Sequence, residues 1–310
     1  MKILKPKFWD QDYYTFFSLF LLPISFFYQI LISLKKLITI KKKFPIPIIC
    51  VGNIYIGGTG KTPLAIKIFE ILKELNKNPV IIKKNYKNHE DEISLIKNYG
   101  KILTSKKRVD AINDAVEKKF NCAVLDDGYQ DFEIKKNLNI ICFNIDQKIG
   151  NGCTIPSGPL RQNLRSLKEC NLILINGKKD VEFEQKLLKY NSKLIFFYYN
   201  YYAKNLLDLK NKKLIAFAGI GNPKNFFNFL KLNQLNIVKE ISYPDHYQYT
   251  EKELDYLIEL EKKYTAKLIT TEKDSFRINS FLRKKFITVP IEVKFQDEKN
   301  FKDTIEKFIK

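Results

Sequence analysis

A glycine-rich segment at residues 57–62, Gly-Gly-Thr-Gly-Lys-Thr, follows a hydrophobic stretch and precedes an amphipathic one. In this setting backbone N–H groups can surround phosphate oxygens, and the N-terminus of the next helix adds positive potential. Lys61 can reach the β- and γ-phosphates, and the Thr62 hydroxyl can hold Mg²⁺. The pattern G-x-x-x-x-G-K-[ST] is met except at its first glycine, where Tyr55 stands. We predict a variant phosphate-binding loop that binds a nucleoside triphosphate through Gly57, Gly58, Thr59, Gly60, Lys61 and Thr62.

Two adjacent acids, Asp126 and Asp127, end the apolar stretch at residues 122–125. A phosphate loop needs a carboxylate at the end of a neighbouring buried strand to organise the metal ion. A solvated strand end is the alternative, but the Gly-Tyr-Gln that follows and the position downstream of the loop favour a metal role. We therefore predict that Thr62, Asp126 and Asp127 hold Mg²⁺, with Asp126 as the principal ligand. These two motifs leave the phosphate acceptor open.

Short apolar runs alternate with amphipathic segments beyond residue 44, which is typical of an α/β protein with a mainly parallel sheet. A second, smaller α/β unit begins near Lys213, and the aromatic run at 196–202 is expected to be an extended link between the two units. The first unit is expected to have strands at 46–51, 79–82, 101–104, 122–125, 139–143 and 172–175 and helices at 62–76 and 108–118. The second is expected to have strands at 214–218, 237–242 and 268–270, helices at 223–232 and 250–263, and a last strand and helix.

Residues 13–34 carry no formal charge, and about 20 apolar residues suffice to span a bilayer. Pro23 and several polar side chains interrupt the run, so a helix that lies in the membrane interface is a second possibility, and a buried core helix is a third. The lysines that follow favour an anionic, cytoplasmic membrane surface; they are Lys35, Lys36, Lys41, Lys42 and Lys43. We predict a membrane-associated N-terminal helix.

The net charge of +20 suggests phosphate-bearing, lipid or nucleic-acid partners. A general enrichment in lysine is an alternative explanation, because only five of the 54 basic residues are arginine. The five cysteines are widely spaced and include no Cys-x-x-Cys pair, and the chain has two histidines, so a structural zinc site is not expected.

Six motifs occur in the order and approximate spacing of the tetraacyldisaccharide 4′-kinases of lipid A biosynthesis, at residues 51–63, 125–130, 156–161, 217–223, 243–246 and 271–274. The resemblance implies transfer of the γ-phosphoryl group of ATP, with Mg²⁺, to the 4′-hydroxyl of a membrane-embedded tetraacyldisaccharide 1-phosphate. The product would be the bis-phosphorylated lipid A precursor, lipid IVA, of lipopolysaccharide biosynthesis. The implied location is the cytoplasmic face of the inner membrane of a Gram-negative bacterium. The lipid and the membrane surface would be the partners, with no nucleic acid and no obligate protein partner.

The resemblance also implies a catalytic pair, Asp91 and His246, which acts with Lys61. In this pair the aspartate would accept the proton of the 4′-hydroxyl and the histidine would orient it. Because the two residues lie far apart in the chain, they are expected to meet only if the two units close over one cleft. Without the resemblance, Asp91 would be a solvated acid and His246 a loop residue.

Several positions depart from the family's pattern. Its Ser-Arg-Gly-Tyr-Gly motif reads Lys-Lys-Asn-Tyr-Lys at residues 83–87, and its Gly-Asp-Glu-Pro motif reads Glu-Asp-Glu-Ile at 90–93. Asp131 stands where the family has histidine, and Gln162 where it has an acid. Contacts with substrate, or support of the site, are expected from Lys84, Tyr86, Glu92, Arg108, Gln130 and Arg161. For Arg108 a solvated helix start is the alternative, and for Arg161 a turn residue paired with an acid.

We expect an N-terminal helix and basic linker at residues 1–43, a P-loop kinase core at 44–205 and a C-terminal α/β domain at 206–310 that closes over the active site. Two other functions are possible. One is a P-loop GTPase or metallochaperone-type switch, because residues 176–180 approach Asn-Lys-x-Asp with one extra residue. The other is a nucleic-acid-binding ATPase, suggested by the charge and the interleaved aromatic residues.

Overall fold

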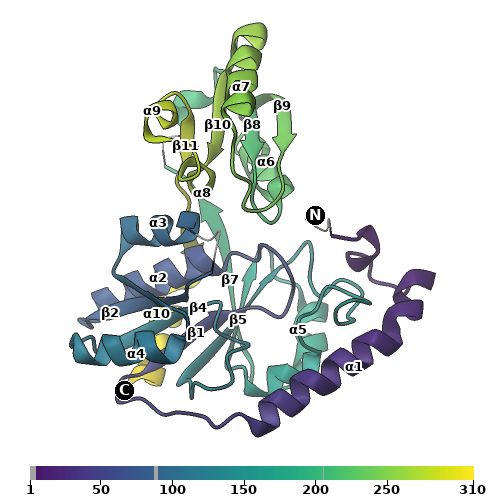
Figure 1. The fold of residues 1–310 in the computed structure, drawn as a ribbon, viewed down its shortest axis with the longest axis vertical. Coiled ribbons are helices and arrows are strands. Elements are labelled where there is room, and N and C mark those ends of the chain that lie inside the picture. The colour runs from purple at the N-terminus through teal and green to yellow at the C-terminus, as the bar shows by residue number, and fades with distance from the viewer. Residues whose placement is uncertain (1–4, 87–89, 205) are drawn as a thin grey trace. The chain divides into compact units, whose positions relative to one another are not determined.

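The computed structural model describes residues 5–86, 90–204 and 206–310 (Figure 1). The chain folds into two compact units, each built from segments that are not contiguous in sequence. The larger unit contains the described residues within Ile3–Asn85, Gly100–Asn200 and Val293–Lys310. The smaller unit contains those within Tyr86–Tyr99 and Tyr201–Glu292.

In the described part of the larger unit, eight strands form a sheet in the order β12-β7-β6-β5-β1-β4-β2-β3. Neighbours from β7 to β3 pair in parallel. All residues of β1 and β4 are buried, as expected of parallel strands covered on both faces. The strands are β1 (Ile48–Gly52), β2 (Pro79–Lys84), β3 (Ile102–Ser105), β4 (Cys122–Asp126), β5 (Leu138–Asn144), β6 (Leu172–Asn176), β7 (Ile195–Tyr202) and β12 (Glu292–Phe295).

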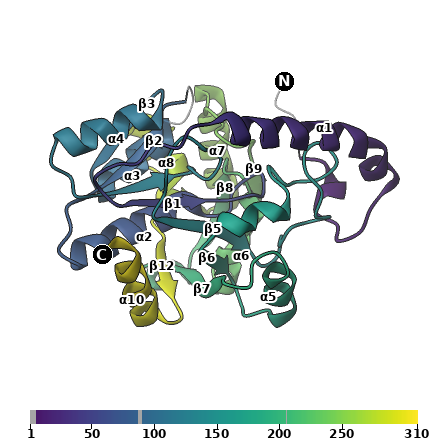
Figure 2. The same ribbon diagram turned by 90° about the horizontal axis from the view of Figure 1, so that it is seen from below.

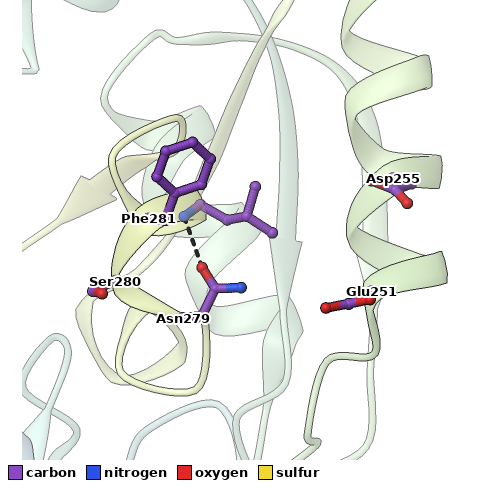
Figure 3. A pocket seen from close by; sticks show the side chains of 6 residues that line it. Glu251, Asp255, Asn279, Ser280 and Phe281 are labelled. Atoms are coloured by element: carbon purple, nitrogen blue, oxygen red, sulfur yellow. Dashed lines mark hydrogen bonds between the residues drawn. The ribbon is translucent and has the colours of Figure 1, made fainter.

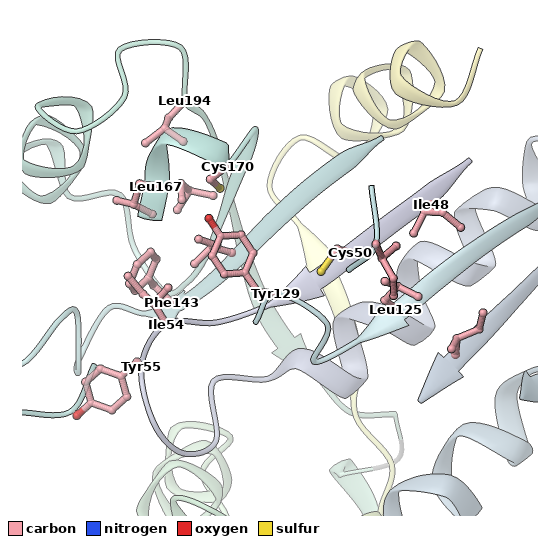
Figure 4. Packing of buried hydrophobic residues seen from close by; sticks show 14 of the residues in the cluster. Ile48, Cys50, Ile54, Tyr55, Leu125, Tyr129, Phe143, Leu167, Cys170 and Leu194 are labelled. Atoms are coloured by element: carbon pink, nitrogen blue, oxygen red, sulfur yellow. The ribbon is translucent and has the colours of Figure 1, made fainter. Parts of the chain in front are cut away.

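Except for the N-terminal helix, the helices of the larger unit cover this sheet because one side of each carries apolar residues. In the helix after the glycine-rich loop, Leu64, Ile68 and Leu72 recur at helical spacing and are fully buried. The core packs around Ile48, Leu125 and other apolar side chains of the central strands (Figure 4). The helices are α1 (Phe16–Ile38), α2 (Lys61–Glu74), α4 (Arg108–Glu117), α5 (Val181–Leu188) and α10 (Glu298–Ile309), with 3-10 turns at Lys7–Trp9 and Leu164–Glu169.

The smaller unit has a four-stranded parallel sheet in the order β11-β10-β8-β9, counted over its described residues. Its sheet has an apolar core on each face, because alternate residues of β8 point to opposite sides. The strands are β8 (Lys213–Ala218), β9 (Asn236–Ser242), β10 (Lys267–Thr271) and β11 (Ile287–Val289). The helices are α3 (Glu90–Tyr99), α6 (Pro223–Leu232), α7 (Glu251–Tyr264), α8 (Glu272–Ser275) and α9 (Ser280–Arg283), with a 3-10 turn at Leu207–Leu209.

Most expected elements are present within one or two residues of their predicted bounds, and the mainly parallel α/β fold is confirmed. Thr250 and Glu253 form a capping box at the start of α7. Several segments differ from expectation, and helix α5 is one that was not expected. The aromatic run 196–202 is extended, as expected, but it is not only a link, because it forms strand β7 and pairs with β6 in the sheet of the larger unit. Helix α3 was not expected and belongs to the smaller unit, whereas β12 contributes to the sheet of the larger unit and α10 belongs to that unit.

Helix α1 exposes its apolar side chains and docks through polar ones. Its two buried residues are serines: Ser25 Oγ donates to the Thr154 carbonyl at 2.8 Å, and the Ser18 carbonyl accepts from Ser157 Oγ at 2.5 Å. Figure 2 shows α1 along the outside of the larger unit. Its 23 residues have a mean hydropathy of 1.9 in their most apolar 18-residue window, of which 11% is buried, so its length and composition would suffice to cross a membrane. The alternative of a buried core helix is therefore wrong.

Candidate active site

The glycine-rich loop joins β1 to α2, as its sequence predicted. Gly57 and Gly60 have φ of 108° and 79°, a region that other residues rarely adopt, and Gly60 caps the start of α2. Asn53 holds the loop from inside, because its Nδ2 donates to the Thr59 hydroxyl at 2.8 Å and to the Tyr55 carbonyl at 2.5 Å. The arrangement is that of a phosphate-binding loop at a helix N-terminus.

Tyr55, which stands at the position of the missing glycine, holds the start of the loop in place. Its ring is 1% exposed (Figure 4), and its hydroxyl donates to the Asp10 carboxylate. The residues around it are also braced by the segment 156–161: Ile56 N–H donates to the Pro159 carbonyl at 2.8 Å, and Arg161 N–H donates to the Ile54 carbonyl at 2.6 Å. The variant loop is thus fixed by the buried tyrosine and a neighbouring segment.

Asp126 lies at the end of β4, next to the loop helix. Its Oδ2 accepts from Thr62 Oγ1 at 3.0 Å and from Lys83 Nζ at 2.6 Å. Its Oδ1 is buried and has no hydrogen-bond partner among the described residues. A buried, unpartnered carboxylate oxygen beside a hydroxyl suits a cation, and Mg²⁺ commonly takes one or two carboxylates together with substrate phosphates. Thr62 and Asp126 therefore fit Mg²⁺.

Asp127 faces cations instead. Its φ is 56°, and its carboxylate accepts from Arg161 at 3.0 and 3.1 Å and lies 3.7 Å from Lys61 Nζ. Burial alone would raise the pKa of Asp127, but Lys61 and Arg161 lower it to about 2. The structure shows Asp127 as the partner of Lys61 and Arg161, which agrees with the paired-turn alternative for Arg161. A metal contact of Asp127 stays a prediction.

Two of the other predicted residues, Gln130 and Arg108, support this site through hydrogen bonds to its backbone carbonyls. Gln130 Nε2 donates to the Asn53 carbonyl at 2.8 Å, which ties the second motif to the start of the loop. Arg108 is 4% exposed, and its guanidinium donates to the carbonyls of Asp126 and Asp127 at 3.0 and 2.9 Å. The alternative of a solvated helix start for Arg108 is therefore wrong: this side chain fixes the turn that carries both acids.

Lys83 is a site residue that the sequence analysis missed. Its side chain is 5% exposed, and β2 places it in register with Asp126 on β4. The signal was a lysine at the carboxyl end of an apolar strand, but only the strand order shows which acid it faces. Lys84, at the end of β2, is half-buried, and Tyr86 is 44% exposed. Residues 87–89, which include His89 and the last residue of the altered motif, lie outside the described residues.

The predicted catalytic pair lies within the smaller unit. His246 Nδ1 is 3.3 Å from Asp91 Oδ1 and 3.2 Å from Oδ2, and Asp91 is 4% exposed. The expectation that the pair needs closure of two units is wrong, because α3 carries Asp91 into the same unit as His246. Glu92 lies beside them and accepts from Lys273 Nζ at 2.8 Å.

Asp91 is surrounded by positive charge. Arg277 donates to its Oδ2 from Nε at 2.9 Å and also from a terminal nitrogen, and Lys273 Nζ lies 3.8 Å away. Burial alone would raise the pKa of Asp91. The hydrogen bond from His246 and the charges of Lys273 and Arg277 reverse that effect and hold the pKa far below its ordinary value. Asp91 is therefore a firmly ionised carboxylate.

A pocket of about 430 Å³ also lies in the smaller unit, between α7 and the α9 turn (Figure 3). None of the predicted site residues lines it. The side chains that do are Glu251, Asp255, Asn279, Ser280, Phe281 and Leu282. Asn279 Oδ1 there accepts from the Leu282 backbone at 2.8 Å, an ordinary cap of α9.

The parallel sheet, the loop before α2 and the Thr62–Asp126 contact define a nucleotide-binding protein of the P-loop class. Within that class, the family model of tetraacyldisaccharide-1-P 4′-kinase matches residues 17–310, and the chain belongs to this family. It is 42% identical to a tetraacyldisaccharide 4′-kinase of Pelagibacter ubique, over 99% of this chain and 98% of that protein. It is 34% identical to one of Rickettsia typhi, over 94% and 95%.

A solved structure has a similar fold. It is that of LpxK from Aquifex aeolicus in complex with ATP, with a TM-score of 0.70, 22% sequence identity and coverage of 94% of this chain and 99% of that one. The family membership confirms the resemblance read from the six motifs and does not favour a GTPase-type switch or a nucleic-acid-binding ATPase.

Proposed function

We propose that the protein transfers the γ-phosphoryl group of ATP to the 4′-hydroxyl of tetraacyldisaccharide 1-phosphate and forms lipid IVA. The ATP-binding part of this proposal rests on Oδ1 of Asp126, which is buried and has no hydrogen-bond partner among the described residues. It lies beside Thr62, at the start of the helix that follows the loop. Membership of the 4′-kinase family supplies the acceptor. The relatives named above come from Gram-negative bacteria, which make lipid A.

In the nucleotide half, the loop N–H groups and the N-terminus of α2 would bind the phosphates, and Lys61 would add its charge. Mg²⁺, if held by Thr62 and Asp126, would neutralise negative charge on the phosphates. Lys61 is already oriented by Asp127 at 3.7 Å, and Arg161 holds Asp127 from the other side. These residues bind and place the nucleotide.

In the acceptor half, the contacts favour the reverse of the expected roles in the catalytic pair. Lysine can only donate hydrogen bonds, so the 3.4 Å contact of Lys273 Nζ makes His246 Nε2 an acceptor. The ring proton is then on Nδ1 and faces Asp91, an assignment that follows from the hydrogen-bond network. A carboxylate with so low a pKa is a weak base. We therefore assign proton acceptance to His246 Nε2 and orientation of the ring to Asp91.

We expect Asp91→Ala and His246→Ala each to lower kcat by roughly 10²-fold, in the range of lost acid–base catalysis. The double variant should lose much less than the product of the two, because residues that act as a unit are not additive. The KM for ATP should barely change. Steady-state kinetics of the four proteins tests this, with Glu251→Ala as a control for loss of an acid elsewhere in the smaller unit. Multiplicative losses would contradict a working pair.

We propose that α1 places the protein on a membrane that holds the lipid acceptor, with the following lysines facing anionic headgroups. Deleting residues before Lys35 should release the protein, but it would also remove the contacts of Ser18 and Ser25 that brace the loop segment. Glutamate at three exposed positions, Phe20, Phe27 and Leu31, keeps those contacts. A separate control, Leu232→Glu, alters another highly exposed apolar residue, in the smaller unit.

Co-sedimentation with vesicles of phosphatidylethanolamine and phosphatidylglycerol measures the result. The triple α1 variant should lose most of its binding, since each charge would have to enter an apolar layer. The Leu232→Glu control should bind like the wild type. If the triple variant still sediments with vesicles at high salt, another surface is the anchor.

The function itself is tested by incubating the protein with labelled ATP, Mg²⁺ and the acceptor. Transfer of label to lipid that depends on the acceptor, with ATP preferred over GTP in competition, is the expected result. Nucleotide hydrolysis that is unaffected by the acceptor, or stimulation by nucleic acid, would support one of the other two functions instead.

A further inference from the structure

We infer that Arg277 is a positioning residue of the reaction, which sets both the side chain and the backbone of His246. This inference rests on the proposed function of the Asp91–His246 pair. The Arg277 side chain is 2% exposed. One edge of its guanidinium binds Asp91 Oδ2, from Nε at 2.9 Å and from the second terminal nitrogen. Asp91 in turn contacts His246 Nδ1, so Arg277 fixes the group that orients the imidazole.

The other terminal nitrogen of Arg277 reaches the backbone of His246 by a second route. It donates to the Gly219 carbonyl at 2.6 Å, and the same carbonyl accepts the His246 N–H at 3.1 Å. His246 has φ of 55°, an uncommon backbone conformation for a residue with a side chain, which needs such support. A Cβ added at Gly219 would lie 3.1 Å from the Pro244 carbonyl, so glycine permits this close approach of the loop.

Arg277 is itself held in place by Asp274. The same terminal nitrogen lies 2.9 Å from Asp274 Oδ1, and this oxygen also accepts from the Gly219 N–H at 3.0 Å and from Tyr249 at 2.9 Å. Both groups are buried. The planar guanidinium of Arg277 therefore binds the carboxylates of Asp91 and Asp274 and the carbonyl of Gly219 at once. The ammonium of a lysine has a single nitrogen and cannot reach all three groups.

The remaining charged groups around the pair do not duplicate this role. Lys273 lies at the other side of the imidazole, against Nε2 and Glu92. Asp245 is 42% exposed and also lies 3.7 Å from Lys273. Arg277 is the residue, among those described, that contacts both Asp91 and the carbonyl that binds the His246 backbone.

Kinetics provides the first part of the test, with Arg277→Gln and Arg277→Lys. Both should lower kcat by roughly 10- to 100-fold, as supporting contacts of a catalytic group do in metal sites, with KM for ATP unchanged within about twofold. Arg277→Lys should recover little activity, because it cannot make both contacts. Adding Arg277→Gln to Asp91→Asn should cause a smaller loss than Arg277→Gln causes in the wild type, since only the route through the Gly219 carbonyl is then left to lose.

The second part measures the imidazole directly. The chain has two histidines, so ¹⁵N-detected tautomer signals of His246 can be read beside those of His89, and a His246→Asn variant assigns them. Wild type should show His246 protonated at Nδ1. The Arg277 variants should show a mixture of tautomers for His246 and an unchanged signal for His89. Arg283→Gln, which removes a nearby arginine that donates to the Ile278 carbonyl, should change neither signal.

Melting curves and near-UV circular dichroism of each variant separate loss of positioning from loss of folding. If Arg277→Gln does not fold, Arg277→Lys retains the charge and carries the test. A folded Arg277 variant with wild-type kcat, or one with low kcat and an unchanged His246 tautomer, would overturn the inference. If wild type does not phosphorylate the lipid, the proposed function fails, and the tautomer spectra still show whether Arg277 orients His246.

Discussion

Lys61→Ala is expected to lower kcat by on the order of 10³-fold or more while the protein stays folded. In related phosphoryl-transfer sites, a positively charged side chain that contacts the transferred phosphoryl group raises kcat by at least this factor. The Lys61 side chain is 13% exposed, and its Nζ lies 3.7 Å from the Asp127 carboxylate. Its removal leaves Asp127 paired with Arg161, so the free energy of unfolding should change little.

Initial rates with labelled ATP and thermal melting measure this prediction. Lys67→Ala is a matched control, because Lys67 lies on the same helix and its ammonium pairs with Glu298 at 2.6 Å, away from the loop. That variant should retain turnover. If Lys61→Ala had wild-type turnover and wild-type melting behaviour, the loop 57–62 would not be the phosphate-binding site.

Asp126→Asn is expected to lower kcat on the order of 10³-fold, equivalent to the several kcal/mol that a bound metal ion contributes to charge stabilisation. The amide keeps the shape of the side chain but loses the negative charge that would hold Mg²⁺. The Mg²⁺ concentration for half-maximal rate should rise. The variant should also melt at a lower temperature, because the buried ammonium of Lys83 would lose the Asp126 carboxylate that lies 2.6 Å away.

Adding Lys83→Met to Asp126→Asn separates the effect of the lost charge on stability from its effect on kcat. This second change removes the buried ammonium itself, so the double variant should recover thermal stability without recovering kcat. Asp131→Asn provides a control at a nearby acid, which lies 3.5 Å from Arg108 and has a 22% exposed side chain. A normal rate and normal Mg²⁺ dependence in Asp126→Asn would place the metal-organising carboxylate elsewhere.

Local patterns predicted much of the fold because their causes are local. The loop 57–62, the apolar spacing of α2 and the capping box of α7 each follow from neighbours in sequence. The aromatic run that forms strand β7 was expected to be an extended link between the two units. Only its pairing with β6 and the packing of Phe197 on Phe301 of α10, with ring centroids 5.0 Å apart, show that it belongs to the sheet.

The charged contacts of the site were less predictable, because their partners are distant in the chain. Lys83 meets Asp126 through strand register, and Arg277 meets Asp91 across 186 positions. Spacing alone gave Asp91 and His246 no connection; the family resemblance paired them. For Arg108 the sequence left a solvated helix start open as an alternative, and only the turn after β4 brings the carbonyls that it binds.

The position of the transferred phosphate on the lipid tests the central claim most directly. The protein, in detergent micelles with Mg²⁺ and γ-labelled ATP, is given tetraacyldisaccharide 1-phosphate, and the purified product is analysed by ³¹P and two-dimensional ¹H NMR. Lys61→Ala, handled in the same way, serves as the blank. We predict a second monoester phosphate coupled to the proton at carbon 4′, absent from the blank. Unmodified lipid, or phosphate at any other carbon, would contradict the account.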